Sequence, residues 1–221
     1  THYTDNGFVE QEPEVIYENV LASVQKCLQQ FTEKGFDKSE IAGIGISNQR
    51  ETFVLWDKNG KPLHNAVVWQ CKRSVQICEE LKQQGLAETI QQKTGLVIDP
   101  YFSATKLIWL VRNNDAVKAA LEKGEAFFGT VDAWLLYKFT NGQSYATDYT
   151  NASRTMFFNL HSLQWDEELI KIFGLTGIQL PQVKPSSSLF GETTLNGMFS
   201  TAVPVTGMIG DSHAAAFGEG C

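Results

Sequence analysis

The stretch VTGMIGDSHAAAFG, residues 205–218, joins a strand-like run to a run of small residues, with one acid between them. Residues 205–209 favour a strand, and the alanines after Asp211 favour a helix. Ligands of open α/β sheets bind beyond the carboxyl ends of the strands, and a helix N-terminus stabilises an ionised carboxylate. Asp211 could therefore accept a proton from a substrate hydroxyl. The alternative is a plain helix N-cap, the commonest role of an Asp in this position.

Helix-like and strand-like segments alternate through the rest of the chain, which predicts an α/β protein, most simply of one domain. Apolar residues recur on one face of residues 13–34, a pattern typical of an amphipathic helix. Residues 41–47, IAGIGIS, predict a strand buried on both faces, and residues 52–57 predict a second strand. Residues 145–165 look mostly β-like. Further helices are expected at 74–84, 86–93, 103–113 and 115–123.

Composition narrows the classes of partner. The chain has 221 residues, a net charge of −7 and no cluster of basic residues, so neither a broad nucleic-acid-binding surface nor a nucleic-acid partner is expected. No apolar stretch is long enough for a membrane span, and the first residues are unlike a signal peptide. The four cysteines lack metal-site spacing, so we expect reduced thiols, a cytoplasmic protein and no metal site within the chain.

A second polar segment, NQRET at residues 48–52, lies between two predicted strands. Arg50 offers a rigid fork of donors and Glu51 offers acceptors, so together they could bind a polyhydroxylated small molecule. The alternative is a surface turn with a local ion pair, which contributes little to stability. Spacing alone slightly favours the turn.

Two aromatic residues and one histidine are further candidates. Trp69 closes an apolar run and could be a core residue or a flat wall against a carbon skeleton, and the core is favoured. Tyr101 follows Asp-Pro, so its hydroxyl lies in a turn, free to meet water or a ligand. His213 is expected to be structural, because no catalytic triad can be recognised around it.

Several motifs together resemble the glycerol kinase branch of the FGGY carbohydrate kinases. YFSATKLIWLVRN, residues 101–113, fits the signature of that family. Other similar segments occur in the same order as in glycerol kinases, from about residue 7 to the end of the chain: IGISNQRET, GTVDAWLLYKFT, TDYTNASRTMFFN, LPQVKPSS and GMIGDSHAAAFG.

The resemblance implies a ribonuclease-H-like domain of the actin, hexokinase and Hsp70 type. It implies ATP-dependent phosphorylation of glycerol or a similar small polyol, with ATP and Mg²⁺ as cofactors. Asp211 matches the general base. Arg50, Glu51 and Tyr101 match residues that hold glycerol hydroxyls. Trp69 matches a residue that flanks the glycerol backbone.

The chain departs from the family pattern in two ways. Ser212 and His213 stand where glycerol kinases carry two glutamines, the first of which contacts glycerol. Because serine is shorter than glutamine, that contact is expected to be lost or water-bridged, or the pocket admits a larger substrate. The chain also corresponds only to the substrate-binding N-terminal domain, incomplete at both ends, without the ATP-binding C-terminal domain. By itself it is therefore expected to be inactive. The full-length enzyme is expected to be a homo-oligomer.

Two other functions stay open at this point. The chain could belong to a kinase for another sugar or polyol, which the serine at position 212 allows. It could also be a catalytically inactive polyol-binding fragment.

Overall fold

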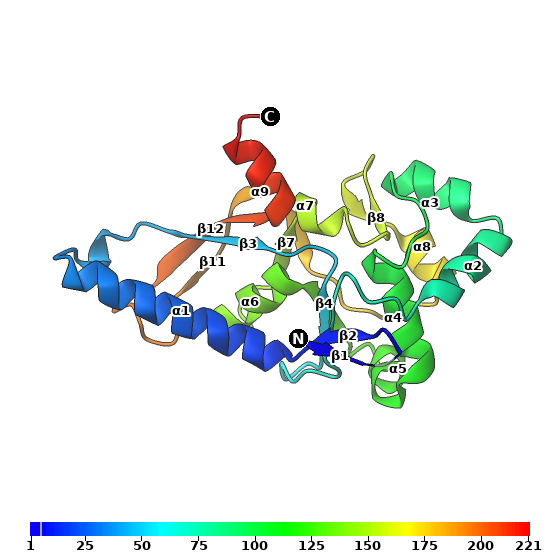
Figure 1. Ribbon diagram of the computed structural model, residues 1–221, viewed down its shortest axis with the longest axis horizontal. Coiled ribbons are helices and arrows are strands. Elements are labelled where there is room, and N and C mark those ends of the chain that lie inside the picture. The colour runs from blue at the N-terminus through cyan, green and yellow to red at the C-terminus, as the bar shows by residue number, and fades with distance from the viewer. Residues whose placement is uncertain (5) are drawn as a thin grey trace.

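The computed structural model describes residues 1–4 and 6–221 (Figure 1). The helices are α1 (Pro13–Glu33), α2 (Val75–Gln83), α3 (Ala87–Thr94), α4 (Ser103–Asn113), α5 (Asp115–Glu122), α6 (Val131–Phe139), α7 (Tyr149–Ala152), α8 (Glu167–Ile172) and α9 (Asp211–Gly218), with a 3₁₀ turn at Lys38–Glu40. The strands are β1 (His2–Tyr3), β2 (Val9–Gln11), β3 (Ile44–Asn48), β4 (Phe53–Trp56), β5 (Ala66–Val67), β6 (Phe127–Thr130), β7 (Ala146–Asp148), β8 (Phe158–Asn159), β9 (Gln164–Trp165), β10 (Gln182–Lys184), β11 (Ser187–Thr193) and β12 (Val203–Gly210).

Two sheets lie side by side in the fold. The larger has the strand order β1-β2-β5-β4-β6, and the smaller has the order β11-β12-β3. In the smaller sheet β12 is antiparallel to β11 and parallel to β3. Groups of strands and helices follow one another along the chain, so the predicted α/β class is confirmed.

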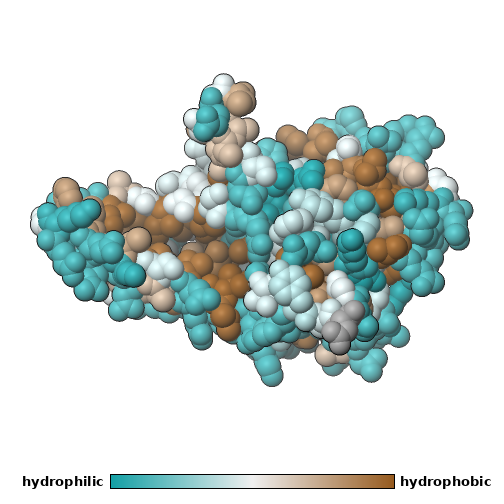
Figure 2. Space-filling model, in the orientation of Figure 1, coloured by the Kyte–Doolittle hydropathy of each residue, from teal (hydrophilic) through white to brown (hydrophobic). Residues whose placement is uncertain are grey.

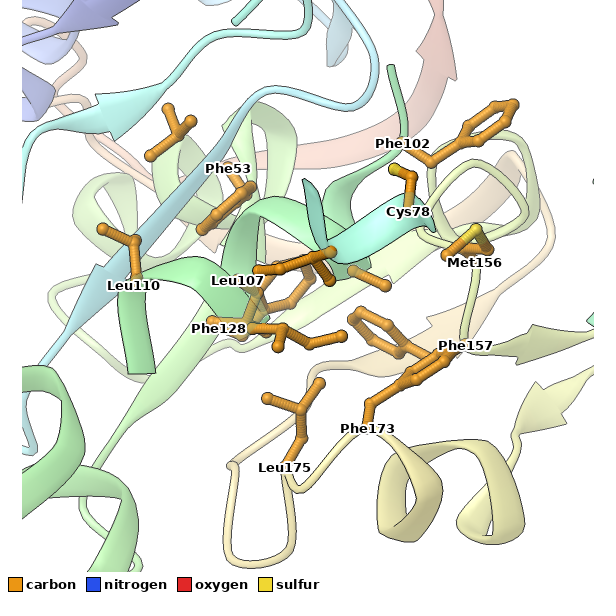
Figure 3. Close-up of a cluster of buried hydrophobic side chains, with 14 of the residues drawn as sticks. Phe53, Cys78, Phe102, Leu107, Leu110, Phe128, Met156, Phe157, Phe173 and Leu175 are labelled. Atoms are coloured by element: carbon orange, nitrogen blue, oxygen red, sulfur yellow. The ribbon is translucent and has the colours of Figure 1, made fainter. Parts of the chain in front are cut away.

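The first core lies between the larger sheet and the helices at the right of Figure 1. Phe53 and Phe128 come from neighbouring strands of that sheet, and their rings lie 5.3 Å apart. Figure 3 shows these rings close to Leu107 and Leu110 of α4, which are both almost fully buried. Helix α4 is therefore anchored to the core by its apolar face.

The second core lies beneath the smaller sheet. Helix α1 runs along the left part of the molecule (Figure 1), and Tyr17 and Leu28 on its inner face are buried with Val205 and Met208 of β12. Figure 2 shows apolar surface on the same part of the molecule. Helix α9 stands out from the end of β12, and its Phe217 is 83% exposed.

Two of the expectations for secondary structure and strand burial are wrong. The strand at residues 41–47 is buried on one face only, because successive residues of β3 point alternately to the core and to the surface. The segment at residues 145–165 is not mostly β. It contains the short helix α7, which begins because the Asp148 carboxylate accepts hydrogen bonds from the backbone N–H groups of Thr150 and Asn151.

Candidate functional site

The pairing of β3 with β12 brings the two polar segments of the sequence together. The strands are parallel, and the last residue of each, Asn48 and Gly210, lie opposite each other. The chain therefore leaves both strands at the same edge of the sheet. Arg50 and Glu51 follow one strand there, and Asp211 follows the other.

Gly210 allows this approach because it has no side chain. A Cβ atom at this position would lie only 2.6 Å from Cγ of Arg50, closer than such atoms pack. The glycine that precedes the acid in the sequence is thus needed for contact with the arginine, not for a special backbone angle, since its φ is −63°.

The guanidinium of Arg50 is held by the first turn of α9. It donates hydrogen bonds to Oγ of Ser212 at 3.0 Å and to Nδ1 of His213 at 3.1 Å, and its Nε lies 3.6 Å from Oδ1 of Asp211. Because an arginine only donates, Nδ1 of His213 must be the unprotonated acceptor. Burial, followed by the charge of Arg50, lowers the pKa of His213, which agrees with a neutral ring.

Asp211 is the first residue of α9 and does not act as its N-cap. The N-cap is Gly210, so the plain capping interpretation is wrong. Oδ1 of Asp211 accepts from the backbone N–H of Ser212 at 2.8 Å, and no described residue donates a hydrogen bond to Oδ2. The side chain is 57% exposed. One oxygen is therefore oriented by the chain while the other can face a hydroxyl.

Glu51 is buried, and its partner is distant in sequence. Only 1% of the residue is exposed, and Nε of Arg154 donates to Oε1 at 2.6 Å. Burial raises the pKa of the Glu51 carboxyl, although Arg154, Arg50 and Lys106 favour its charged form. Its φ of 61° is uncommon for a residue other than glycine and is typical of strained positions at functional sites. A surface turn with a local Arg50–Glu51 ion pair is therefore the wrong interpretation.

The aromatic rings of Trp69 and Tyr101 pack against each other beside the Glu51–Arg154 pair. Their ring centroids lie 5.5 Å apart, and a hollow of about 190 Å³ is lined by both residues. Trp69 is 36% exposed, so its placement in the core was wrong. The guanidinium of Arg154 lies 5.7 Å from the Tyr101 ring centroid, which joins the aromatic pair to Glu51.

The predicted residues therefore form one continuous patch, linked by contacts from Asp211 through Arg50 and Glu51 to the two aromatic rings. Arg154, which links Glu51 to Tyr101, was missed by sequence reasoning. It stands in TNASRT, a segment noted only for its resemblance, and its isolated position between polar residues was the one available signal.

A partly buried polar network behind Asp211 was also missed. The backbone N–H of Gly210 donates to Oγ1 of Thr150 at 2.8 Å, and that hydroxyl donates to Oδ2 of Asp148 at 2.7 Å. The same carboxylate oxygen accepts from Oγ of Ser186 at 2.7 Å. The network holds the last residue of β12, and so it sets where α9 and Asp211 begin.

Replacing Thr150 with valine should lower the free energy of unfolding by about 1–3 kcal/mol, because the Gly210 N–H and the Asp148 carboxylate lose their shared partner while the side-chain volume is kept. Urea unfolding measures this loss. Thr201→Val is the control, since Thr201 is exposed and no side-chain hydrogen bond of its own is found among the described residues. Equal stability of the two variants would contradict a structural role for the Thr150 hydroxyl.

A larger hollow lies elsewhere in the described chain. It measures about 470 Å³ and lies beside Phe217 on the outer face of β3 and β12. None of the predicted substrate residues lines it. The candidate site is therefore the patch that runs from Asp211, Arg50 and Glu51 to the smaller hollow at Trp69 and Tyr101, because donors and acceptors for hydroxyl groups converge at its polar end.

Two further features bear on partners. Among residues 1–4 and 6–221, no group of three or more His, Cys, Asp and Glu side chains lies close enough together to hold a metal ion. Within the same residues, no helix combines the length and apolar character that a membrane crossing requires.

Comparison with known proteins places these features in a family. The N-terminal domain of the FGGY family of carbohydrate kinases matches residues 1–218. Glycerol kinase of Carboxydothermus hydrogenoformans is 48% identical over 221 residues, and glycerol kinase 2 of Thermotoga maritima is 47% identical over 220 residues. These alignments cover 100% and 99% of this chain and 44% of each relative. The chain thus spans less than half the length of the curated relatives that it matches.

Solved structures of carbohydrate kinases have the same fold as this chain. The chain superposes on glycerol kinase of Plasmodium falciparum, solved with ADP, with a TM-score of 0.92 and 35% identity, over 99% of this chain and 44% of that one. A xylulose kinase of Lactobacillus acidophilus matches with a TM-score of 0.84 at 23% identity, over 98% of this chain and 43% of that one, which bears on the fold alone. The predicted ribonuclease-H-like fold is confirmed.

Proposed function

The chain belongs to the FGGY family of carbohydrate kinases, and from this premise we propose that it is the substrate-binding domain of an enzyme that phosphorylates glycerol, or a similar small polyol, with ATP. The domain spans residues 1–221 and supplies the polyol pocket and the general base. The observation that carries the proposal is the juxtaposition of Arg50 and Asp211 across the ends of two parallel strands. Similarity to glycerol kinases supports the choice of substrate.

Each residue of the patch has a role in this proposal. Asp211 accepts the proton of the hydroxyl that attacks the phosphorus atom, because its carboxylate is exposed and its Oδ2 accepts no hydrogen bond from a described residue. Arg50 and Glu51 bind the remaining hydroxyls and so select the one that faces the base. The rings of Trp69 and Tyr101 cover the carbon skeleton of the polyol.

ATP would supply the phosphoryl group, and Mg²⁺ is the usual companion of its phosphates. The contribution of the chain is to orient the polyol and remove its proton. Such positioning is the larger part of what a protein supplies in phosphoryl transfer.

The experiment that tests the proposal uses the natural protein at its full length. With MgATP it should convert glycerol to glycerol 3-phosphate faster than it phosphorylates a tetritol or a ketopentose, as measured by coupled ADP release. Faster turnover of the ketopentose would establish the alternative of a kinase for another sugar. Binding of glycerol in calorimetry without any turnover would establish an inactive polyol-binding protein.

Ser212 is the residue that we expect to set polyol length. A serine there engages Arg50 at 3.0 Å and leaves more room than the longer glutamine of typical glycerol kinases. Ser212→Gln should therefore raise the ratio of kcat/KM for glycerol over the tetritol by roughly threefold to tenfold, which is less than the ~10–200-fold that one methylene can provide in a tight pocket.

The control for this substitution is Ser200→Gln, because Ser200 is exposed in the loop before β12. An unchanged substrate ratio in the Ser212 variant would show that this position does not face the polyol. We also propose a cytoplasmic location and a homo-oligomeric state for the full-length protein. Size-exclusion chromatography with light scattering tests the second proposal.

A further inference from the structure

Lys106 is a buried cation whose partners are main-chain carbonyls. It lies in the first turn of α4 and has an exposed fraction of 0%. Its Nζ donates to the carbonyl oxygens of Pro100 at 2.7 Å, Tyr101 at 2.5 Å and Trp69 at 3.5 Å. Lysine is almost never fully buried without a partner, because removing its charge from water is costly. Its three acceptors here are therefore the reason it can remain inside.

These acceptors belong to two segments that are separate in sequence. Trp69 follows β5, whereas Pro100 and Tyr101 form the turn before α4. Both segments border the 190 Å³ hollow of the candidate site. A contact to a carbonyl fixes the main chain itself, and the main chain sets where each ring begins. The ammonium of Lys106 thus joins the two segments that carry the aromatic wall.

Helix α4 does not depend on this lysine for its own position. Leu107 and Leu110 pack into the first core (Figure 3), and Ser103 donates to the carbonyl oxygen of Glu51 at 2.9 Å. Lys106 forms no ion pair with a described acid. Burial lowers the pKa of its amine to about 7, and the electrostatic influence of nearby acidic side chains, Cys71 and Glu51 foremost, opposes that shift. Its contribution is therefore local to the two loops.

We propose that Lys106 is a positioning residue for the substrate pocket, which holds the backbones of Trp69 and Tyr101 so that their rings form one wall against the polyol. The inference rests on the proposed function, since it assumes that a polyol occupies this wall. Lys106 acts through the two aromatic residues and does not touch the reacting atoms.

The test compares Lys106→Met with Lys106→Gln in the full-length protein. The methionine variant keeps the apolar stem and loses every donor, so the KM for glycerol should rise by about 5–50-fold while kcat changes less than about threefold, because Asp211 is untouched. Glutamine retains one donor group and should give an intermediate KM. Lys118→Met is the matched control, because Lys118 is exposed on α5.

A double-mutant cycle separates positioning from general loss of stability. If Lys106 acts through Trp69, then Trp69→Ala should raise KM less in the Lys106→Met background than in the wild-type protein. Additive effects, or a folded Lys106→Met variant with KM within twofold of wild type, would overturn the proposal. If the methionine variant fails to fold, the same criteria apply to Lys106→Gln.

Hydrogen exchange provides a readout that needs no activity. Backbone amides of residues 69–72, 99, 101 and 102 should exchange at least threefold faster in Lys106→Gln than in the wild type, while those of α1 should be unchanged. Unchanged exchange in both loops would overturn the positioning role even if the protein is an active kinase. Faster exchange in a protein that phosphorylates no polyol would instead remove the proposed function and leave the loop-joining role intact.

Discussion

Replacing Asp211 with asparagine in the full-length protein should lower kcat for glycerol by about two to four orders of magnitude, the usual effect of removing a general base. Asparagine keeps the shape of the side chain and its contact with the Ser212 N–H, so KM should change far less. The reason is chemical: Oδ2 faces no donor among the described residues and can accept a proton, whereas an amide cannot. Steady-state kinetics with saturating MgATP measures both parameters.

The control for this prediction is Asp115→Asn, which makes the same change at an exposed position on α5. Its kcat should equal that of the wild type within about twofold. A near-normal kcat in the Asp211 variant would remove the general-base role and leave Asp211 as a binding residue at most.

The second large effect is expected at Glu51. Glu51→Gln should raise the KM for glycerol by about 10–150-fold, which corresponds to the loss of one charged hydrogen bond worth about 1.5–3 kcal/mol. The carboxylate is already oriented by Arg154 and shielded from water, so its charge is available to a polyol hydroxyl at little entropic cost. Glu79→Gln on α2 is the control, because that glutamate is exposed and its one ion pair within residues 1–4 and 6–221 is with Lys82. An unchanged KM would mean that Glu51 has only a structural role.

The same variant should change how stability depends on pH. Burial raises the pKa of Glu51 in the folded protein, so the folded state retains this proton to higher pH than the unfolded chain does. The stability that the group contributes is therefore fully present below the unfolded pKa of 4.5 and is lost as the pH rises through the raised, folded value. Glutamine cannot ionise, so urea midpoints of the variant should fall less than those of the wild type across this pH interval. Parallel profiles would contradict the raised pKa.

The sequence predicted most of the elements that position the site. The apolar periodicity of residues 13–34 corresponds to α1, and the run after Gly43 corresponds to β3. These predictions succeeded because they depend on spacing within one segment. They failed where burial depends on a distant partner: β3 is covered on one side only, and Trp69 lies at the surface beside Tyr101.

The site residues show the same difference: those marked by a local motif were predicted, and those that depend on a distant partner were not. Asp211, Arg50 and Glu51 were recognised by their motifs. Arg154 and Thr150, which bind Glu51 and Gly210, were not recognised. Arg154 is 103 residues from Glu51, and Thr150 is 60 residues from Gly210, and no local pattern joins residues so far apart. The parallel register of β3 and β12 likewise brings Arg50 to Asp211, although the two residues are far apart in the sequence.

The sequence by itself determined most of the order of strands and helices, the place of Asp211 between a strand and a helix, and the family to which these motifs belong. Each of these depends on residues that are neighbours along the chain, where propensity and spacing act directly. The tertiary structure alone decided which groups share the buried space: Arg154 with Glu51, Thr150 with Gly210, and Lys106 with the carbonyl oxygens of Trp69 and Tyr101. A buried polar or charged group must find a partner wherever the fold provides one, so its role depends on packing in three dimensions.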